Sequence, residues 1–134
     1  MSVTLELINP DGLPTPEAYT HVVVATGIRL VFVAGQEPED EWGNLVGAAD
    51  LAAQAHQVFA NLGRALAAAA ARPEQVTKIT IFVVNYSREQ LPVIDEARAA
   101  LFGDHKPADT LVGVEALSRP EFLIEVEAVA VVDN

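Results

Sequence analysis

Hydrophobic and polar positions alternate along the first 35 residues, and this period of two predicts β-strands. Over positions 3–7, three apolar residues are separated by Thr4 and Glu6, the pattern of a short, half-buried strand. Two runs rich in β-branched residues, 21–25 and 29–34, flank Thr26-Gly27. A short turn between two such runs is a hairpin signal. We therefore expect the second and third strands to pair with each other.

The period changes from two to between three and four after Asp50, which is a good helix N-cap. The apolar residues that recur at these steps are Leu51, Ala55, Val58, Phe59, Leu62 and Leu66. This spacing predicts the core-facing side of a long helix. An alanine run continues the helix to residue 71, and Arg72-Pro73 ends it.

The second half of the chain again predicts strand, helix and strands. Residues 76–85 are mostly apolar and predict a strand that is buried on both faces. A capping-box-like start at Ser87 precedes a second helical stripe, which Gly103 closes. Residues 110–114 and 123–132 predict the last two strands.

These elements predict one α/β domain over residues 1–134, in the order β-β-β-α-β-α-β-β. We expect a six-stranded mixed sheet with both helices on one face. The other face then needs a cover, and in a chain that is 51% hydrophobic the simplest cover is another copy of the chain. The sequence contains no cysteine, which excludes disulfides and thiolate chemistry.

The net charge of the chain limits the kinds of molecule that it can bind. Eight Lys and Arg residues against nineteen Asp and Glu give a formal net charge of −11. A polyanion needs a basic stripe that releases counterions, so we expect no nucleic-acid partner. The N-terminus lacks the pattern of a signal peptide, and the longest stretch of low polarity, 62–71, is too short to span a bilayer. We therefore expect a soluble, cytoplasmic protein with no membrane partner.

Most polar residues offer no recognisable chemistry. His21, His56 and His105 lack metal-ligand spacing, and a structural or solvated role is favoured for each. The alternation around Glu125 and Glu127 is more informative, because it places both carboxylates on one sheet face. They are either a solvated face or carboxylates in a subunit cleft that hold or deprotonate a water molecule.

The chain also resembles a known family over nearly its whole length. The segments that carry the resemblance are 9–16, 19–21, 31–36, 47–50, 53–54, 57–62, 76–83, 106–108, 110–112 and 123–130. In this order and spacing they are similar to the RidA/YjgF family. The resemblance implies a chorismate-mutase-like fold and a homotrimer with small-molecule clefts between subunits. It also implies hydrolysis of reactive enamines and imines to keto acids and ammonia, without a cofactor.

The resemblance assigns roles to particular residues. Tyr19 matches the tyrosine that closes the cleft, and Gly35 with Gln36 match the strand end whose backbone approaches the ligand. Asp95 stands where many members have an asparagine near the cleft. Glu125 matches the glutamate that positions the hydrolytic water.

One position departs from the family pattern. After Pro-Ala, where deaminating members have an arginine, this chain has Asp109, followed by Thr110 as a ligand-binding candidate. That arginine binds the substrate carboxylate through a charge-assisted fork, worth about 1.5–3 kcal/mol. An aspartate adds repulsion, of order 4 kcal/mol at contact distance in a partly screened site. We therefore expect an altered specificity.

Several interpretations of this departure stay open at the level of sequence. Arg29 or Arg119 supplies the cation instead, or the substrate is an amine or neutral enamine that Asp109 favours. In a purely structural interpretation, Asp109 is a loop residue that caps the entry to a strand. For the whole chain, the alternative to an enzyme is a trimer that binds a metabolite without turnover, and a holdase-like interaction protein is a weaker third hypothesis.

Overall fold

The computed structural model describes residues 2–133 and contains the predicted order of elements. The strands are β1 (Thr4–Ile8), β2 (Val22–Thr26), β3 (Arg29–Gln36), β4 (Val76–Val84), β5 (Ala108–Val114) and β6 (Ile124–Val132). The helices are α1 (Leu51–Ala68) and α2 (Leu91–Phe102), and short 3₁₀ turns, Pro73–Gln75 and Arg88–Gln90, precede β4 and α2.

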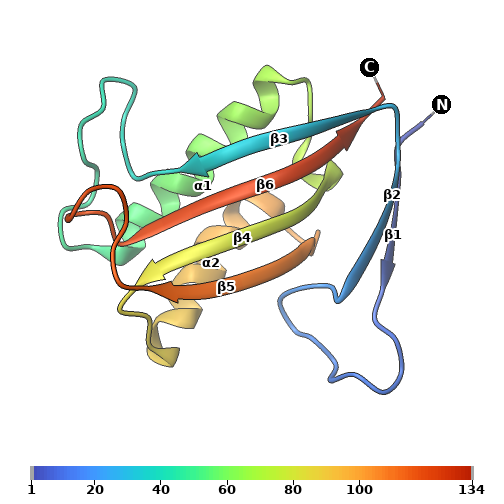
Figure 1. The fold of residues 1–134 in the computed structure, drawn as a ribbon, viewed down its shortest axis with the longest axis horizontal. Helices are drawn as coiled ribbons and strands as arrows, with labels where there is room; N and C mark the ends of the chain where they lie inside the picture. Colours follow the sequence, from blue (N-terminus) through green and yellow to red (C-terminus); the bar gives the residue numbers. More distant parts are fainter. Residues whose placement is uncertain (1, 134) are drawn as a thin grey trace.

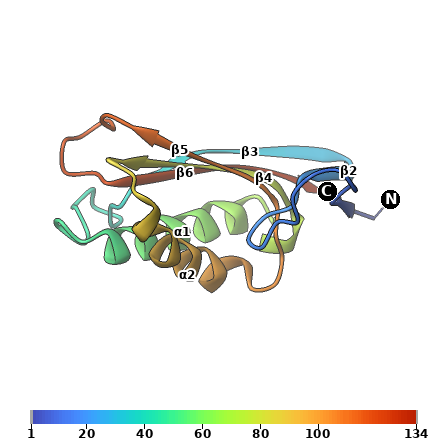
Figure 2. The same ribbon diagram turned by 90° about the horizontal axis from the view of Figure 1, so that it is seen from below.

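The main sheet has the order β3-β6-β4-β5, in which β4 and β5 are parallel and the other pairs are antiparallel. Both helices lie on one face of this sheet (Figures 1 and 2). The mixed α/β class with two helices on one face is therefore confirmed. No helix within residues 2–133 is both long enough and apolar enough to cross a membrane.

The core lies between the sheet and the helices and follows the predicted periodicities. Alternate residues of the central strands are fully buried, among them Ile79 and Ile81 on β4 and Val126 on β6. They meet the predicted stripe of α1, of which Phe59 and Leu62 are almost completely buried. Because successive strand residues point to opposite faces, Glu125 and Glu127 lie on the face without helices.

The expected hairpin between the second and third strands does not form, and this prediction was wrong. β2 pairs with β1 in a separate two-stranded sheet, so the six strands divide into two sheets. A two-residue hairpin turn needs a positive φ at its first residue, and Gly27 does not have one. Gly27 instead passes close to β6, where a Cβ atom would lie 2.5 Å from Val131 Cγ2.

The β1–β2 hairpin is held at the end of the main sheet, where it crosses the strand ends (Figure 1). The Thr20 hydroxyl donates a hydrogen bond to the Lys106 carbonyl, and Thr20 N donates to Pro107 O at 3.3 Å. On the other side, Ile28 N donates to Val132 O at 3.0 Å. These contacts fix the hairpin at both of its ends.

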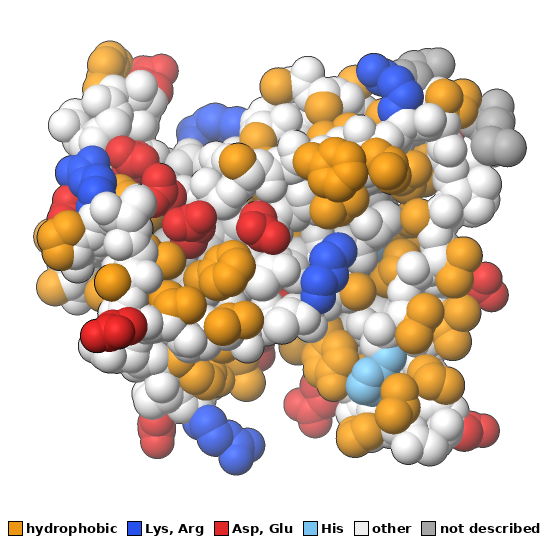
Figure 3. Space-filling view, in the orientation of Figure 1, with side chains coloured by type: hydrophobic (Ala, Val, Ile, Leu, Met, Phe, Trp, Pro, Cys, Tyr) orange, Lys and Arg blue, Asp and Glu red, His pale blue; other side chains and the backbone are white. Residues whose placement is uncertain are grey.

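The face of the main sheet without helices is rich in exposed apolar side chains. Leu30 and Phe32 on β3 are 63% and 74% exposed, values that are high for such large hydrophobic residues. Figure 3 looks onto this face, where hydrophobic side chains surround a few acidic ones. The homo-oligomer expected from this open face stays a prediction.

Candidate functional site

The structure brings Gly35 and Glu125, two of the predicted site residues, into direct contact. The register between β3 and β6 is irregular between Val33 and Gln36, as at a β-bulge. At this point a Cβ atom on residue 35 would lie 1.9 Å from Glu125 Oε2. Glycine is therefore required at position 35 for the carboxylate to lie against the β3 backbone.

The environment of Glu125 favours its protonated form. Burial raises the pKa of the Glu125 carboxyl, and the negative charges of Glu37 and Glu127 raise it further. Desolvation and nearby like charge both disfavour the ionised form of a carboxyl group. A carboxyl group whose pKa is raised in this way is suited to exchanging a proton with a substrate or a water molecule.

An open cleft of about 730 Å³ begins at Gly35 and Gln36. It lies between α1 and the segment that joins β3 to α1, and four acidic residues line it, Glu37, Glu39, Asp40 and Glu41. Trp42 stands at the same cleft and is 77% exposed. Arg64 on α1 also lines it, so the cleft is mainly acidic, with one arginine and one aromatic side chain.

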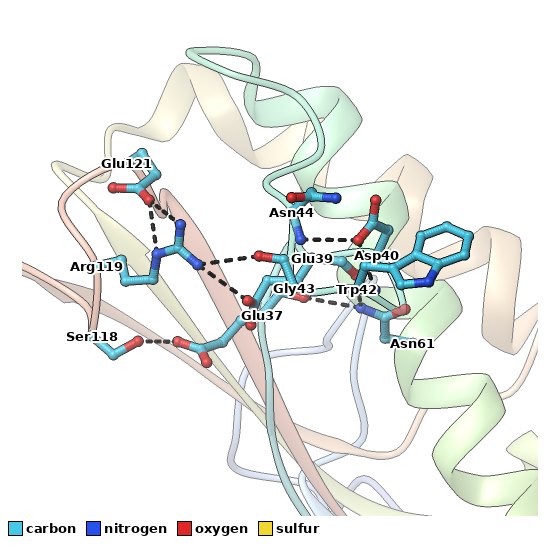
Figure 4. Close-up of polar contacts among 10 residues, drawn as sticks. All are labelled: Glu37, Glu39, Asp40, Trp42, Gly43, Asn44, Asn61, Ser118, Arg119 and Glu121. Carbon is cyan, nitrogen blue, oxygen red and sulfur yellow. Dashed lines mark hydrogen bonds and ion pairs between the residues drawn. The ribbon is translucent and has the colours of Figure 1, made fainter.

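Polar contacts hold the segment beside this cleft in place (Figure 4). Asn61 on α1 donates to the carbonyl oxygens of Glu37 and Glu39 at 3.0 and 2.9 Å. Asp40 accepts hydrogen bonds from the backbone of Trp42 and Asn44 at 3.0 and 2.9 Å. The shape of the cleft therefore depends on side chains from both α1 and the segment itself.

Neither arginine that the sequence offered as a substitute cation is available near Glu125. Arg119 pairs with Glu121 at 2.8 Å and with Glu39 at 3.3 Å (Figure 4). Arg29 begins β3, six residues before Gly35, which is roughly 20 Å along an extended strand.

Asp109 lies inside β5, and its carboxylate is 5% exposed on the helix side of the sheet. There it pairs with Arg98 of α2, which also pairs with Asp95. Burial raises the pKa of Asp109, and the Arg98 guanidinium offsets part of this rise. The interpretation of Asp109 as a loop residue was therefore wrong, because the residue belongs to a buried ion cluster.

Sequence reasoning missed Arg98. Its signal was the spacing of three residues between Asp95 and Arg98 on a predicted helix, which places the two side chains on one face. The pairing with Asp109 joins α2 to β5, and no local pattern predicts such a contact.

The remaining predicted residues lie at the start of β5. Tyr19 packs edge-on against His21, with ring centroids 5.1 Å apart, and the neighbouring Thr20 is bonded to Lys106. Thr110 lies on the opposite face of β5 from Asp109 and accepts a hydrogen bond from the Lys78 ammonium. A smaller cavity of about 310 Å³ beside α2 is lined by Asp95, Arg98 and Lys106, among others.

Within a single chain, the residues around Asp109 do not meet the residues around Glu125. Asp109 and Glu125 lie on strands separated by β4, and their side chains are on opposite faces of the sheet. Within residues 2–133, no group of three or more His, Cys, Asp or Glu side chains is arranged to hold a metal ion. The candidate chemistry therefore centres on Gly35, Gln36 and Glu125.

Comparison with known proteins places this geometry in context. The family model described as endoribonuclease L-PSP matches residues 12–132. The 3-aminoacrylate deaminase RutC of Acinetobacter baylyi is 33% identical over 93% of this chain and 96% of its own length.

Two solved structures resemble the fold over nearly the whole chain. YyfB of Yersinia pestis, a protein of unknown function of the conserved Rid protein family, has a TM-score of 0.89 at 37% identity, covering 98% of this chain and all of its own. A putative endoribonuclease from Thermotoga maritima has a TM-score of 0.70 at 32% identity, covering 96% and 98%.

Proposed function

The chain belongs to the Rid family, and from this premise we propose that it is a hydrolase of the enamine/imine deaminase type with an altered substrate. Its substrate lacks the carboxylate that the family arginine binds in other members. The observation that carries this proposal is the buried cluster in which Asp109, at the position of the family arginine, pairs with Arg98 on the helix side of the sheet.

The ion pair between Asp109 and Arg98 changes how strongly Asp109 repels an anionic substrate. Because Arg98 neutralises much of the Asp109 charge, repulsion of an anionic substrate is weaker than an isolated aspartate would cause. The guanidinium fork is still missing, and Arg98 is already occupied by two carboxylates. Loss of a charge-assisted hydrogen bond costs about 1.5–3 kcal/mol, or roughly one to two orders of magnitude in affinity.

In this proposal, Glu125 activates the water molecule that attacks the imine. Water adds to the C=N carbon of the imine, and the Glu125 carboxylate accepts one proton of that water. The resulting carbinolamine collapses to a carbonyl compound, and its nitrogen leaves as ammonia after it receives the proton. The products contain the atoms of the imine plus one water molecule, so no oxidant or cofactor is needed.

The neighbouring cleft supports a substrate of neutral or positive charge. Its acidic lining and the net charge of −11 attract cations. The exposed face of Trp42 is suited to contact with an ammonium or iminium group. An imine without a carboxylate, which is readily protonated, matches these features.

The test compares two imines made in situ, one from alanine by an amino-acid oxidase and one from a simple primary amine by an amine oxidase. Semicarbazide trapping reports how fast each imine disappears. We expect the protein to accelerate hydrolysis of the carboxylate-free imine, with little effect on 2-iminopropanoate, and Glu125→Gln to abolish the acceleration. Glu96→Gln, which removes an exposed charge on α2, is the matched control.

The alternative is a trimer that binds a metabolite without turnover. The observation in its favour is that neither Arg29 nor Arg119 is available beside Glu125 to bind an anionic substrate. If neither imine is hydrolysed faster than the background, while small amines still raise the melting temperature of the protein, the binding function replaces the hydrolase.

A further inference from the structure

The backbone edge of β3 that faces away from β6 is unpaired, as is the edge of β2 that faces away from β1. Within residues 2–133, each of these two strands hydrogen-bonds to one neighbour. An unpaired edge presents a row of N–H and C=O groups that can pair with a strand of another chain. Both edges belong to the segment that the sequence predicts to be a hairpin.

The two strands carry few of the features that protect a free edge: β2 has none, and in β3 they are confined to its two ends, Arg29 and the irregularity before Gln36. β2 (Val22–Thr26) contains no proline or charged residue, and the only charged residue of β3 is Arg29 at its first position. Natural edge strands are usually interrupted by such residues. Their absence from β2 and from the middle of β3 indicates that each edge pairs with something in the functional protein.

The two edges do not meet within one chain. Gly27 lies against Val131, and Ile28 is bonded to Val132, so the connection does not reverse the chain. At its other end the hairpin is fixed by Thr20. The β3 edge therefore remains open in the isolated subunit.

The side chains of the two strands are nevertheless complementary. A two-residue connection at 27–28 sets an antiparallel register in which Val24 is opposite Val31 and Val23 is opposite Phe32. The first pair would lie on the helix side of the sheet and the second on the open face. Pairing would cover Val24 and Phe32, which are 47% and 74% exposed.

We propose that β2 of one copy pairs with the β3 edge of a second copy in this register, so that the hairpin is exchanged between subunits. Exchange between copies keeps the contacts of a hairpin and changes only which chain supplies them. The interface would run along β3 to Gly35 and so place a subunit boundary beside Glu125. This inference does not depend on the proposed enzyme activity.

Cysteine cross-linking tests the exchange, because the natural sequence has no cysteine. The single variants Val24→Cys and Val31→Cys are mixed and oxidised, as are Val23→Cys and Phe32→Cys. Two adjacent pairs are used because opposite residues in antiparallel strands alternate between close and wider spacing. The mixture of Val24→Cys with Phe32→Cys, which face opposite sides in this register, is the control.

We expect a covalent dimer from at least one matched mixture and little from the control. If neither matched mixture cross-links, or if the control does so equally well, the exchange is wrong. In a single chain with Val24→Cys and Val31→Cys, a disulfide found within monomers instead of between them would assign β2 to its own β3 and would also overturn the proposal.

A change of the connection provides a second test. In Gly27→Asn/Ile28→Gly, the new Asn-Gly pair favours a tight type I′ turn, and the Asn side chain clashes with Val131 in the observed conformation. We expect this variant to move the disulfide of the Val24→Cys/Val31→Cys chain from between subunits to within one subunit. An unchanged intermolecular cross-link would contradict the role assigned to Gly27.

Discussion

At the scale of single residues, the contact between Gly35 and Glu125 predicts a pH dependence of stability. Burial, Glu37 and Glu127 raise the pKa of Glu125 in the folded chain. Between the ordinary pKa of glutamate and this raised value, the folded state binds more protons than the unfolded state. The contribution of Glu125 to the free energy of unfolding therefore falls as the pH rises through this window.

The Glu125→Gln variant removes this contribution. We expect it to match the wild type below the ordinary pKa of glutamate and to become the more stable of the two as the pH rises toward 7. Urea unfolding at several pH values measures the difference, and Glu96→Gln is the control. A constant difference across the pH range would show that Glu125 is not desolvated in solution.

The ion cluster leads to a second prediction at this scale. Arg98→Met leaves the carboxylate of Asp109 buried without its partner, a change that costs about 3–5 kcal/mol. Adding Asp109→Asn should recover a large part of the loss, because the buried charge is removed with the cation. Urea unfolding of both variants checks this, and equal stabilities would mean that Asp109 reaches water.

The sequence predicted the direction in which single side chains point better than it predicted their surroundings. The alternation around Glu125 places it on the open face because side-chain direction in a strand is a local property. The pairing of Asp109 with Arg98 depends on how α2 packs against β5, and single-residue patterns carry no such information. For the same reason the sequence could not show that Arg119 is bound by Glu39 and Glu121.

At the scale of elements, one buried side chain joins α1 to two separate loops. Gln54 has no exposed surface, and its amide nitrogen donates to Gly47 O and to Glu121 O, each at 3.0 Å. Its amide oxygen accepts from Leu123 N at 2.8 Å. The ion pair between Arg119 and Glu39 also joins these two loops.

We expect Gln54→Met to destabilise the protein by about 2–4 kcal/mol, because the Glu121 carbonyl and the Leu123 N–H lose their hydrogen bonds to Gln54, whereas Gly47 O keeps its bond from Asp50 N. Thermal and urea unfolding give the magnitude. Gln57→Met, on the same helix but less buried, should cost less. Similar losses for both would contradict the role of Gln54 as the link between the loops.

The success of the helix predictions and the failure of one strand pairing have the same cause. Helix periodicity is local, and both α1 and α2 form close to where it placed them. Strand pairing depends on the turn, and Thr26-Gly27 resembles a hairpin turn in sequence alone. The close approach of Gly27 to Val131 is a contact across 104 positions, which the local pattern could not reveal.

At the scale of the whole molecule, the open sheet face and the unpaired β3 edge both predict association. We expect a trimer in solution, with a mass three times the chain mass of 14.3 kDa, because exposed Leu30 and Phe32 need a cover. Light scattering at micromolar concentration measures this. Phe32→Lys should weaken the trimer, whereas Trp42→Lys, at the cleft, should not; a stable wild-type monomer would contradict the expectation.

The charge of the molecule also bears on the endoribonuclease description of the matching family model. The eight basic residues are few, and Arg72, Arg98 and Arg119 already pair with acidic side chains. A net charge of −11 repels a polyphosphate over a distance of about 8–10 Å at physiological salt. Binding would have to overcome this repulsion without the release of counterions that drives protein–RNA association.

We therefore expect no detectable binding of a labelled single-stranded RNA oligomer at 150 mM salt, measured by fluorescence anisotropy up to high micromolar protein. Lowering the salt should not restore binding, because weaker screening strengthens the repulsion between two anions. A basic RNA-binding domain of similar size serves as the positive control. Tight binding that weakens as salt is added would mean that the assembled protein forms a basic surface that the single chain lacks.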